Sequence, residues 1–320
     1  MTIIHRFSVI LAATATVASA TVITAAVITT AVITTAVIIT AAPALAQDGA
    51  DIYLATLKGK DDLVKIGTPK NITNRPGYDN QPSYTADGTR ILFTSIRDDQ
   101  ADIYQYDIQT ETVSQVTRTA ESEFSPTPIP GMTDFSVVRV EADSAQRLWA
   151  FTGDGTAAKL LLADAGPVGY HAWGDDPDHV AIFVLGEPHY LQLANLRRMP
   201  LVTVATDIGR SLQKIPGKPA ISFTQKRGEM WWVDELDLAS RKTRPLIQAV
   251  PGSEDCAWTP DGVLLMAKGT TVYACRPGAS EWAEVARFDD LAMGPVTRLA
   301  VSPKGDRLAL VAGEPAPDEE

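Results

Sequence analysis

A pattern of about 44 residues repeats six times along this chain, and it restricts the possible folds more than any other feature. Each copy centres on an anchor position, usually aromatic or β-branched, that precedes a turn such as T-A-D-G or T-P-D-G. Successive anchors lie 44, 45, 41, 44 and 43 residues apart. The six anchors are Tyr84, Pro128, Trp173, Lys214, Trp258 and Val301. A period of about 40–45 residues with several strands in each copy is typical of a β-propeller.

Short apolar runs follow each anchor and are expected to form strands. The Asp-Gly pair after the clearest anchors suits a tight antiparallel turn, because glycine can take the positive φ that the turn needs. The runs that would form the second strands lie at 91–93, 135–138, 180–183, 220–223, 263–266 and 308–311. Third strands are expected at 51–53, 102–104, 147–149, 189–191, 230–232 and 271–273, and fourth strands at 113–116, 159–162, 201–204, 245–247 and 284–286.

The first third-strand copy precedes the first anchor, and no strand-like run follows the last second strand. We therefore predict that residues 51–73 supply the outer strands of a sixth blade whose inner strands come from 298–311. Such closure leaves no exposed sheet edge between the chain ends. The predicted fold is all-β, a six-bladed β-propeller over residues 47–314, closed by N-terminal strands that complete the last blade. A flexible acidic tail is expected at 315–320.

The first 46 residues read as a signal peptide. His5 and Arg6 precede a long apolar run, and Ala44-Leu45-Ala46 resembles a cleavage site. A cut after Ala20 is an alternative. The run is also long enough to span a membrane, for which about 20 apolar residues suffice. We predict a periplasmic or secreted protein with no membrane insertion after signal removal; the alternative is a protein anchored in the membrane by its N-terminus.

Charge and cysteine content restrict the partners and the type of stabilisation. The chain has 28 Lys and Arg residues against 39 Asp and Glu residues, a net charge of −11. Nucleic acids and anionic lipids attract basic clusters, so we predict no nucleic-acid partner. Cys256 and Cys275 fall on the first and third strands of one blade. Those strands are about 9–10 Å apart, too far for a disulfide, so we expect two buried thiols although an exported protein can form disulfides.

Two motifs suggest a metal site and a dinucleotide-binding site, but their positions in the repeat give each of them a structural explanation. The group His171, Asp175, Asp176, His179 and His189 has metal-ligand residue types, but both aspartates occupy the anchor turn. The sequence G-D-G-T-A-A at 153–158 matches a dinucleotide fingerprint, yet it lies between two strand-like runs, as a hairpin turn would. We predict no metal site, no cofactor and no catalytic residue.

The segments just before the inner strands are expected to form one rim of the central channel, where propellers commonly bind ligands. This rim would contain Asp79, Asn80, Glu123, His171, Arg210, Glu254, Asp255 and Arg298, which are our candidate binding residues. The alternative is that these polar residues only line a water-filled channel. Aromatic residues at repeat positions, such as Trp173 and Trp258, are expected to pack between blades.

Three blocks resemble the TolB-type propeller repeat of exported bacterial proteins: Q-P-S-Y-T-A-D-G-T-R-I-L-F at 81–93, A-D-I-Y-Q-Y-D at 101–107 and A-W-T-P-D-G-V-L-L at 257–265. The resemblance implies a six-bladed propeller in the periplasm. TolB proteins also carry an α/β domain before the propeller and work with an outer-membrane lipoprotein. Here six repeats fill the chain after Gln47, so we expect that domain to be lacking, which puts the specific Tol role in doubt.

These observations favour an exported, non-enzymatic binding module, with one chain forming the whole ring as a monomer. Its channel rim would bind a protein, a peptide or another component of the cell envelope. The alternative is a metal-dependent hydrolase or lyase in which rim carboxylates and His171 hold a metal that activates water.

Overall fold

The computed structural model describes residues 49–59, 64–198, 200–279 and 281–313. The predicted signal peptide and the acidic tail lie outside the described residues. Within the described ranges the secondary structure is all-β, and none of these residues belongs to a helix that is long and apolar enough to cross a membrane.

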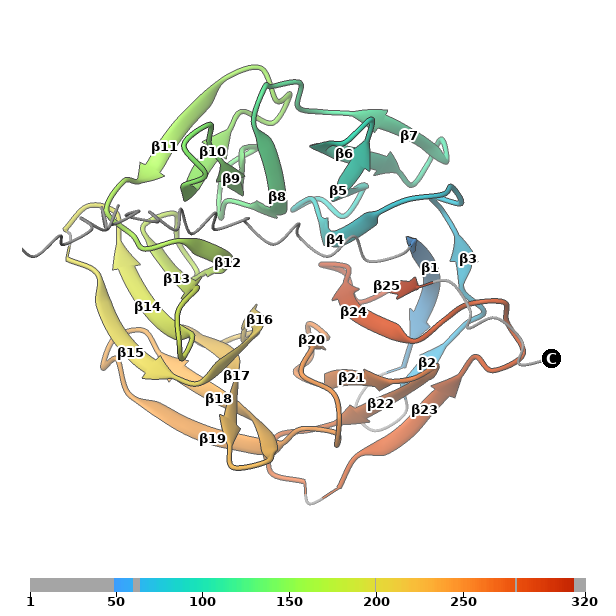
Figure 1. Ribbon diagram of the computed structural model, residues 1–320. Helices are drawn as coiled ribbons and strands as arrows, with labels where there is room; N and C mark the ends of the chain where they lie inside the picture. The colour runs from blue at the N-terminus through green and yellow to red at the C-terminus, as the bar shows by residue number, and fades with distance from the viewer. Residues whose placement is uncertain (1–48, 60–63, 199, 280, 314–320) are drawn as a thin grey trace, which may run out of the picture. The chain divides into compact units, whose positions relative to one another are not determined.

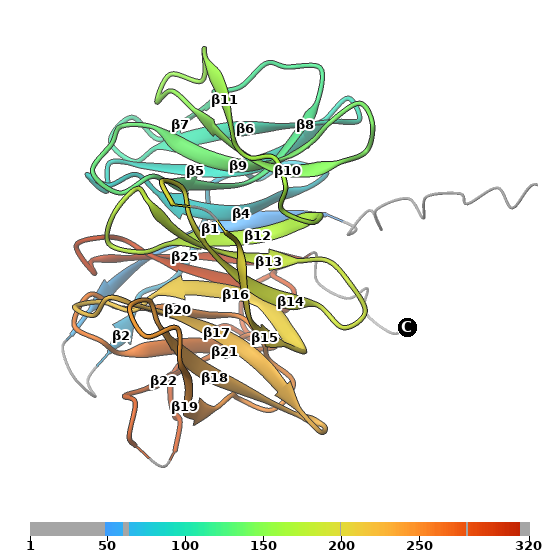
Figure 2. The same cartoon turned by 90° about the vertical axis from the view of Figure 1, so that its left-hand side faces the viewer.

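The strands form six sheets arranged around a central axis, so the protein is a six-bladed propeller (Figure 1). Figure 2 shows the same ring turned by 90°. Blade 1 consists of β4 (Asp79–Tyr84), β5 (Arg90–Arg97), β6 (Gln100–Asp107) and β7 (Thr112–Gln115). Blade 2 consists of β8 (Ser122–Pro128), β9 (Phe135–Val140), β10 (Gln146–Phe151) and β11 (Ala158–Leu162). Blade 3 consists of β12 (Val168–Trp173), β13 (His179–Val184), β14 (Tyr190–Asn195) and β15 (Val202–Thr206).

Blades 4 and 5 consist of β16 (Ile208–Lys214), β17 (Ala220–Arg227), β18 (Met230–Asp237) and β19 (Thr243–Gln248); and β20 (Cys256–Trp258), β21 (Leu264–Lys268), β22 (Thr271–Cys275) and β23 (Ala283–Arg287). The expected second and third strands are present, and the five expected fourth strands are confirmed to within a few residues at their ends.

Both ends of the described chain share blade 6. β24 (Val296–Val301) and β25 (Arg307–Gly313) form its inner strands, and β1 (Ala50–Lys58) pairs antiparallel with β25 (Figure 1). In this register Tyr53 lies opposite Leu310, and Ala55 opposite Leu308. The short strands β2 (Lys65–Ile66) and β3 (Lys70–Asn71) pair with the other edge of β1. This is the pairing that the unequal strand count predicted.

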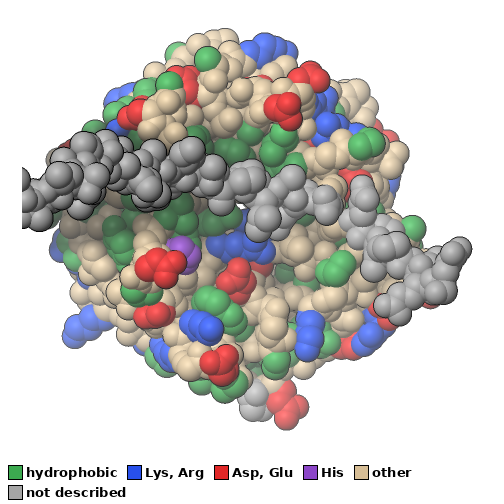
Figure 3. Space-filling model, viewed as in Figure 1, with side chains coloured by type: hydrophobic (Ala, Val, Ile, Leu, Met, Phe, Trp, Pro, Cys, Tyr) green, Lys and Arg blue, Asp and Glu red, His purple; other side chains and the backbone are tan. Residues whose placement is uncertain are grey.

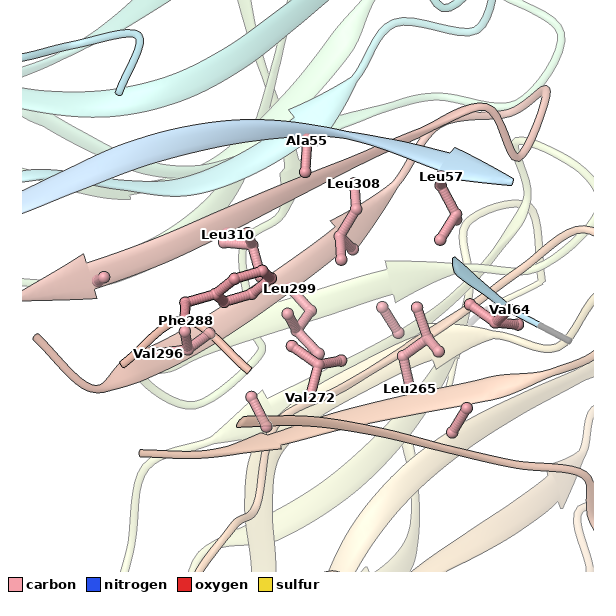
Figure 4. Packing of buried hydrophobic residues seen from close by; sticks show 14 of the residues in the cluster. Ala55, Leu57, Val64, Leu265, Val272, Phe288, Val296, Leu299, Leu308 and Leu310 are labelled. Atoms are coloured by element: carbon pink, nitrogen blue, oxygen red, sulfur yellow. The ribbon is translucent and has the colours of Figure 1, made fainter. Parts of the chain in front are cut away.

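Six clusters of buried apolar side chains hold the ring together, one at each junction between neighbouring blades. At the junction of blades 5 and 6, Leu57 from β1 and Leu308 from β25 belong to the same cluster as Leu265 from β21 (Figure 4). The N-terminal strand therefore adds apolar burial as well as hydrogen bonds to the closure of the ring.

The anchor turns close on themselves through a repeated hydrogen bond. Thr85 Oγ1 donates to Asp87 Oδ1 at 2.6 Å, and Thr259 Oγ1 donates to Asp261 Oδ1 at the same distance. Gly88 follows with φ of 70°, the left-handed conformation that favours glycine. The T-x-D-G sequence thus caps its own turn in the two copies that contain it, after Tyr84 and Trp258.

Cys256 and Cys275 are both buried and no disulfide joins them, as expected from the strand that separates them. Residues 152–157 form the turn between β10 and β11, so the hairpin interpretation of the glycine-rich sequence is confirmed.

Candidate functional site

The innermost strands of the six blades surround a central cavity of about 630 Å³. These strands are β4, β8, β12, β16, β20 and β24. Each contributes lining residues, so the cavity exists only when the ring is complete. Its volume is within the range of small-ligand sites, about 300–1,000 Å³.

Prolines form most of the channel mouth. The residue two positions after the anchor is proline in four of the six copies, and all four line the cavity: Pro130, Pro216, Pro260 and Pro303. Ala86 occupies the same position in blade 1 and is exposed. Proline lacks a backbone N–H and has a fixed φ. Blade 3 has Asp175 at this position, paired with Lys214 of the lining at 2.9 Å. The mouth is therefore rigid and apolar apart from this ion pair.

The floor of the channel is a ring of six side chains that share one repeat position, three residues before each anchor. All six line the cavity: Gln81, Ser125, Tyr170, Ser211, Asp255 and Arg298. Pairing in five of the inner strands is irregular at or close to this position, as a β-bulge produces. Gln81 and Ser125 also take positive φ values of 59° and 54°. Bulges of this kind re-aim side chains. We call these six residues the floor ring.

One contact crosses the floor ring from blade 6 to blade 3, on the opposite side of the axis. Arg298 Nη2 donates to Tyr170 Oη at 2.9 Å, and the guanidinium carbon lies 4.8 Å from the centre of the Tyr170 ring. The two residues are 128 positions apart in sequence. The pair narrows the channel at this level.

A second cavity of about 380 Å³ lies among blades 4, 5 and 6 and shares Arg210, Asp255 and Arg298 with the channel. Arg210 Nε lies 3.2 Å from Glu254 Oε1, and Glu254 lines only the second cavity. Basic and acidic side chains are visible together at the centre of the ring in Figure 3. The floor ring therefore separates two cavities.

Asp255 is the most perturbed charged group of the floor. Burial raises the pKa of Asp255 to about 6, although Arg298 and Arg210 act in the opposite direction. Its Oδ1 accepts a hydrogen bond from the Leu299 amide at 3.2 Å. The carboxylate is thus held by the backbone of the neighbouring blade, and its Oδ2 lies 3.8 Å from Arg298 Nη1.

His171 is buried in the channel wall and bonded to the neighbouring blade. Its Nε2 lies 2.6 Å from Ser136 Oγ, which also accepts a hydrogen bond from Trp173 Nε1 at 2.9 Å. Burial lowers the pKa of His171 to about 3, so the imidazole is neutral at physiological pH. His171 Nδ1 has no hydrogen-bond partner among the described residues.

The same arrangement recurs two blades further along, which gives it a structural explanation. Trp258 Nε1 donates to Ser222 Oγ at 2.8 Å, and Cys256 occupies the repeat position of His171 and interacts with Ser222. Either histidine or cysteine can occupy this position beside the serine, so the shared role of the arrangement is to hold two neighbouring blades together. We therefore assign His171 to the inter-blade packing.

Three of the eight candidate rim residues line neither cavity. Asp79 is buried beside Arg75, with 3.4 Å between the guanidinium and the carboxylate. Asn80 accepts a hydrogen bond from the Gln81 amide. Glu123 lies between blades 1 and 2, where it accepts hydrogen bonds from the hydroxyls of Thr117 and Thr119.

The expectation that the candidate residues precede the inner strands is wrong for six of them. Asp79, Asn80, Glu123, His171, Arg210 and Arg298 lie inside strands, and only Glu254 and Asp255 precede one. The inner strands begin earlier than their apolar pattern suggests, because the bulge interrupts the alternation of buried and exposed side chains. Tyr170, which the rim prediction missed, could have been found by counting three residues back from each anchor.

The histidines and aspartates considered as metal ligands do not converge. Asp176 accepts a hydrogen bond from the His179 amide, and Asp175 pairs with Lys214 at 2.9 Å. His189 Nδ1 accepts from the Gly186 amide. No group of three or more His, Cys, Asp or Glu side chains suited to a metal occurs in the described part of the chain.

Comparison with known proteins identifies the fold. No family model and no curated protein sequence matches the chain. Among solved structures, a protein provisionally named TolB from Agrobacterium tumefaciens aligns with a TM-score of 0.68 at 10% identity, over 84% of this chain and 100% of that one. The chain thus has the fold of a TolB-like six-bladed propeller.

Two further structures with this fold have different functions. A gluconolactonase from Xanthomonas campestris aligns with a TM-score of 0.58 at 10% identity, over 83% of this chain and 98% of that one. A chain of the nidogen/laminin complex aligns with a TM-score of 0.57 at 12% identity, over 84% of this chain and 100% of that one. At such identities the likeness concerns the fold alone.

Proposed function

We propose that this protein is an exported, non-enzymatic binding module that takes a segment of a cell-envelope protein into its central channel. The observation that carries the proposal is the channel itself, a cavity of about 630 Å³ with a proline mouth and a polar floor. A rigid, largely apolar mouth can contact a peptide chain without losing much conformational entropy of its own. The floor ring then offers hydrogen-bonding groups to whatever reaches it.

The proposal fits the remaining properties of the chain. Its net charge of −11 disfavours nucleic acid as the partner. The nidogen/laminin chain is a propeller that forms part of a protein complex. A single chain of this protein completes the ring, so binding needs no second copy.

An enzymatic alternative follows from the gluconolactonase, which shows that the fold also supports catalysis. It would require reactive groups that converge on the channel. His171 is instead tied to Ser136 in an arrangement that Cys256 and Ser222 repeat. We therefore favour binding over catalysis.

Affinity capture from envelope extracts, followed by mass spectrometry, tests the proposal. Ala86→Trp places a large side chain at the channel mouth without disturbing a buried position. Ala142→Trp makes the same change in an exposed turn outside the channel lining and is the matched control. We expect the wild type and the Ala142 variant to retain an envelope protein that the Ala86 variant loses. Equal capture by all three would contradict a channel site.

A further inference from the structure

Arg298 is the one arginine of the floor ring, and its hydrogen-bonding capacity is largely unused. A guanidinium has five N–H donors. Within the described part of the chain, Arg298 makes one hydrogen bond, from Nη2 to Tyr170 Oη. Its side chain is only 12% exposed, and it lines both cavities. Its unused donors are not fully buried, so a ligand in either cavity can reach them.

The carboxylate nearest to Arg298 does not use these donors. Arg298 Nη1 lies 3.8 Å from Asp255 Oδ2, beyond hydrogen-bonding distance. Elsewhere in the chain, Arg244 binds Glu235 through two hydrogen bonds of 3.0 and 2.8 Å. The other carboxylate oxygen, Asp255 Oδ1, accepts a hydrogen bond from the Leu299 amide. Asp255 is thus a buried ion-pair partner of Arg298 that leaves the N–H donors of the guanidinium without a carboxylate hydrogen bond.

The second arginine at the floor, Arg210, lies closer to an acid than Arg298 does. Its Nε is 3.2 Å from Glu254 Oε1, although in a geometry that forms no hydrogen bond, and its Nη2 donates to the Thr297 carbonyl at 3.4 Å. The remaining members of the floor ring are uncharged: Gln81, Ser125, Tyr170 and Ser211. Ser125 Oγ is buried and has no hydrogen-bond partner among the described residues.

We propose that Arg298 is the anchoring point for a carboxylate group of the protein segment that enters the channel. The planar fork of a guanidinium matches the two oxygens of a carboxylate, and such bidentate pairs are strong and directional. This inference rests on the proposed function, because the ligand arrives through the same channel.

The local charges favour a carboxylate over other groups. A cationic side chain would meet the guanidinium groups of Arg210 and Arg298. A phosphate, with a charge near −2, would be repelled more strongly than a carboxylate by Glu254 and by Asp255, which is itself a member of the floor ring. A carboxylate carries a single negative charge, and its two oxygens match the N–H donors of Arg298 that make no hydrogen bond.

Titration of protein labelled with ¹⁵N-arginine tests the assignment. The probes are N-acetylglycine, which carries a chain-terminal carboxylate, and N-acetylaspartic acid α-amide, which carries a side-chain carboxylate. N-acetylglycinamide is the neutral control, and ionic strength is kept constant because salt screens charge interactions. The Nε–H signal of Arg298 is assigned from Arg298→Lys. If that variant is unfolded by circular dichroism, Tyr170→Phe assigns the signal by removing its hydrogen-bond partner.

We expect the Arg298 signal to shift and saturate with at least one carboxylate and not with the amide; which carboxylate succeeds identifies the source. Arg298→Lys should weaken binding about tenfold or more, as expected for losing a bidentate charged contact. Arg197→Gln, which changes an arginine whose side chain is 75% exposed, should leave the affinity unchanged.

Equal, unsaturated shifts with the carboxylates and the amide would overturn the assignment. The outcome is independent of the capture experiment. Saturable binding without a captured protein would keep this site and reject the protein partner. Capture of a partner without a saturable shift would reject the site and keep the proposed function.

Discussion

Replacement of Glu123 by glutamine should change how the stability of the protein depends on pH. Glu123 is fully buried between blades 1 and 2, and burial raises its pKa to about 7 from an ordinary value of 4.5. Its two hydroxyl partners and Arg139, 3.5 Å away, oppose the shift without cancelling it. Arg139 makes its closer contact with Glu121.

The sign of the effect follows from proton linkage. Between pH 4.5 and about 7 the folded state keeps the proton that the unfolded state loses, so the free energy of unfolding falls as pH rises. Each pKa unit corresponds to about 1.4 kcal/mol, so Glu123 alone should lower the stability by about 3 kcal/mol between pH 4.5 and 8. Glutamine stays neutral throughout.

Urea unfolding of the wild type and of Glu123→Gln, followed by circular dichroism from pH 4.5 to 8, measures this difference. We expect the variant to gain about 3 kcal/mol relative to the wild type as pH rises. In an Asp102→Asn background the gain should be smaller, because the charge of Asp102 contributes to raising the pKa of Glu123. A difference that does not change with pH would refute the reasoning.

Three further changes test the fold by urea unfolding. Leu308→Ala, at a fully buried position of the ring closure, should lower the free energy of unfolding by about 2–5 kcal/mol. Val113→Ala, on an outer strand, should change it by no more than about 1 kcal/mol. Similar losses in the two variants would contradict the role of the closure. Gly155→Ala and Gly217→Ala both place alanine at positive φ, at a cost of about 1–2 kcal/mol of stability. Only at Gly155 would the new Cβ also lie 2.4 Å from a carbonyl oxygen, so Gly155→Ala should lose more stability than Gly217→Ala. Ser136→Ala leaves its tryptophan and histidine partners without a hydrogen bond and should cost about 1–3 kcal/mol; no loss would contradict the inter-blade junction.

The six blades could be predicted because their sequence signals are local. The T-x-D-G turn forms within a few residues, and apolar runs of fixed spacing indicate the strands that follow. The closure of blade 6 followed from counting strands, since the segment at Tyr53 needed a partner that only the segment at Leu310 could supply.

The geometry of the channel floor could not be predicted in the same way. Gln81 and Ser125 adopt positive φ although neither is glycine or asparagine, so the residue types at these positions do not indicate the irregular strand pairing. The contact between Arg298 and Tyr170 depends on two strands that face each other only when the ring is closed. Glu123 has the same charge as Asp255, yet blade packing turns it away from the channel.

Hydrogen–deuterium exchange of the protein with and without its captured envelope partner tests the central claim most directly. The account predicts slower exchange at the mouth turns around Ala86 and Pro260 and in the segment before β20, with outer strands such as β7 and β15 unchanged. Protection confined to the outer strands, with the mouth and floor unaffected, would contradict the channel as the binding site.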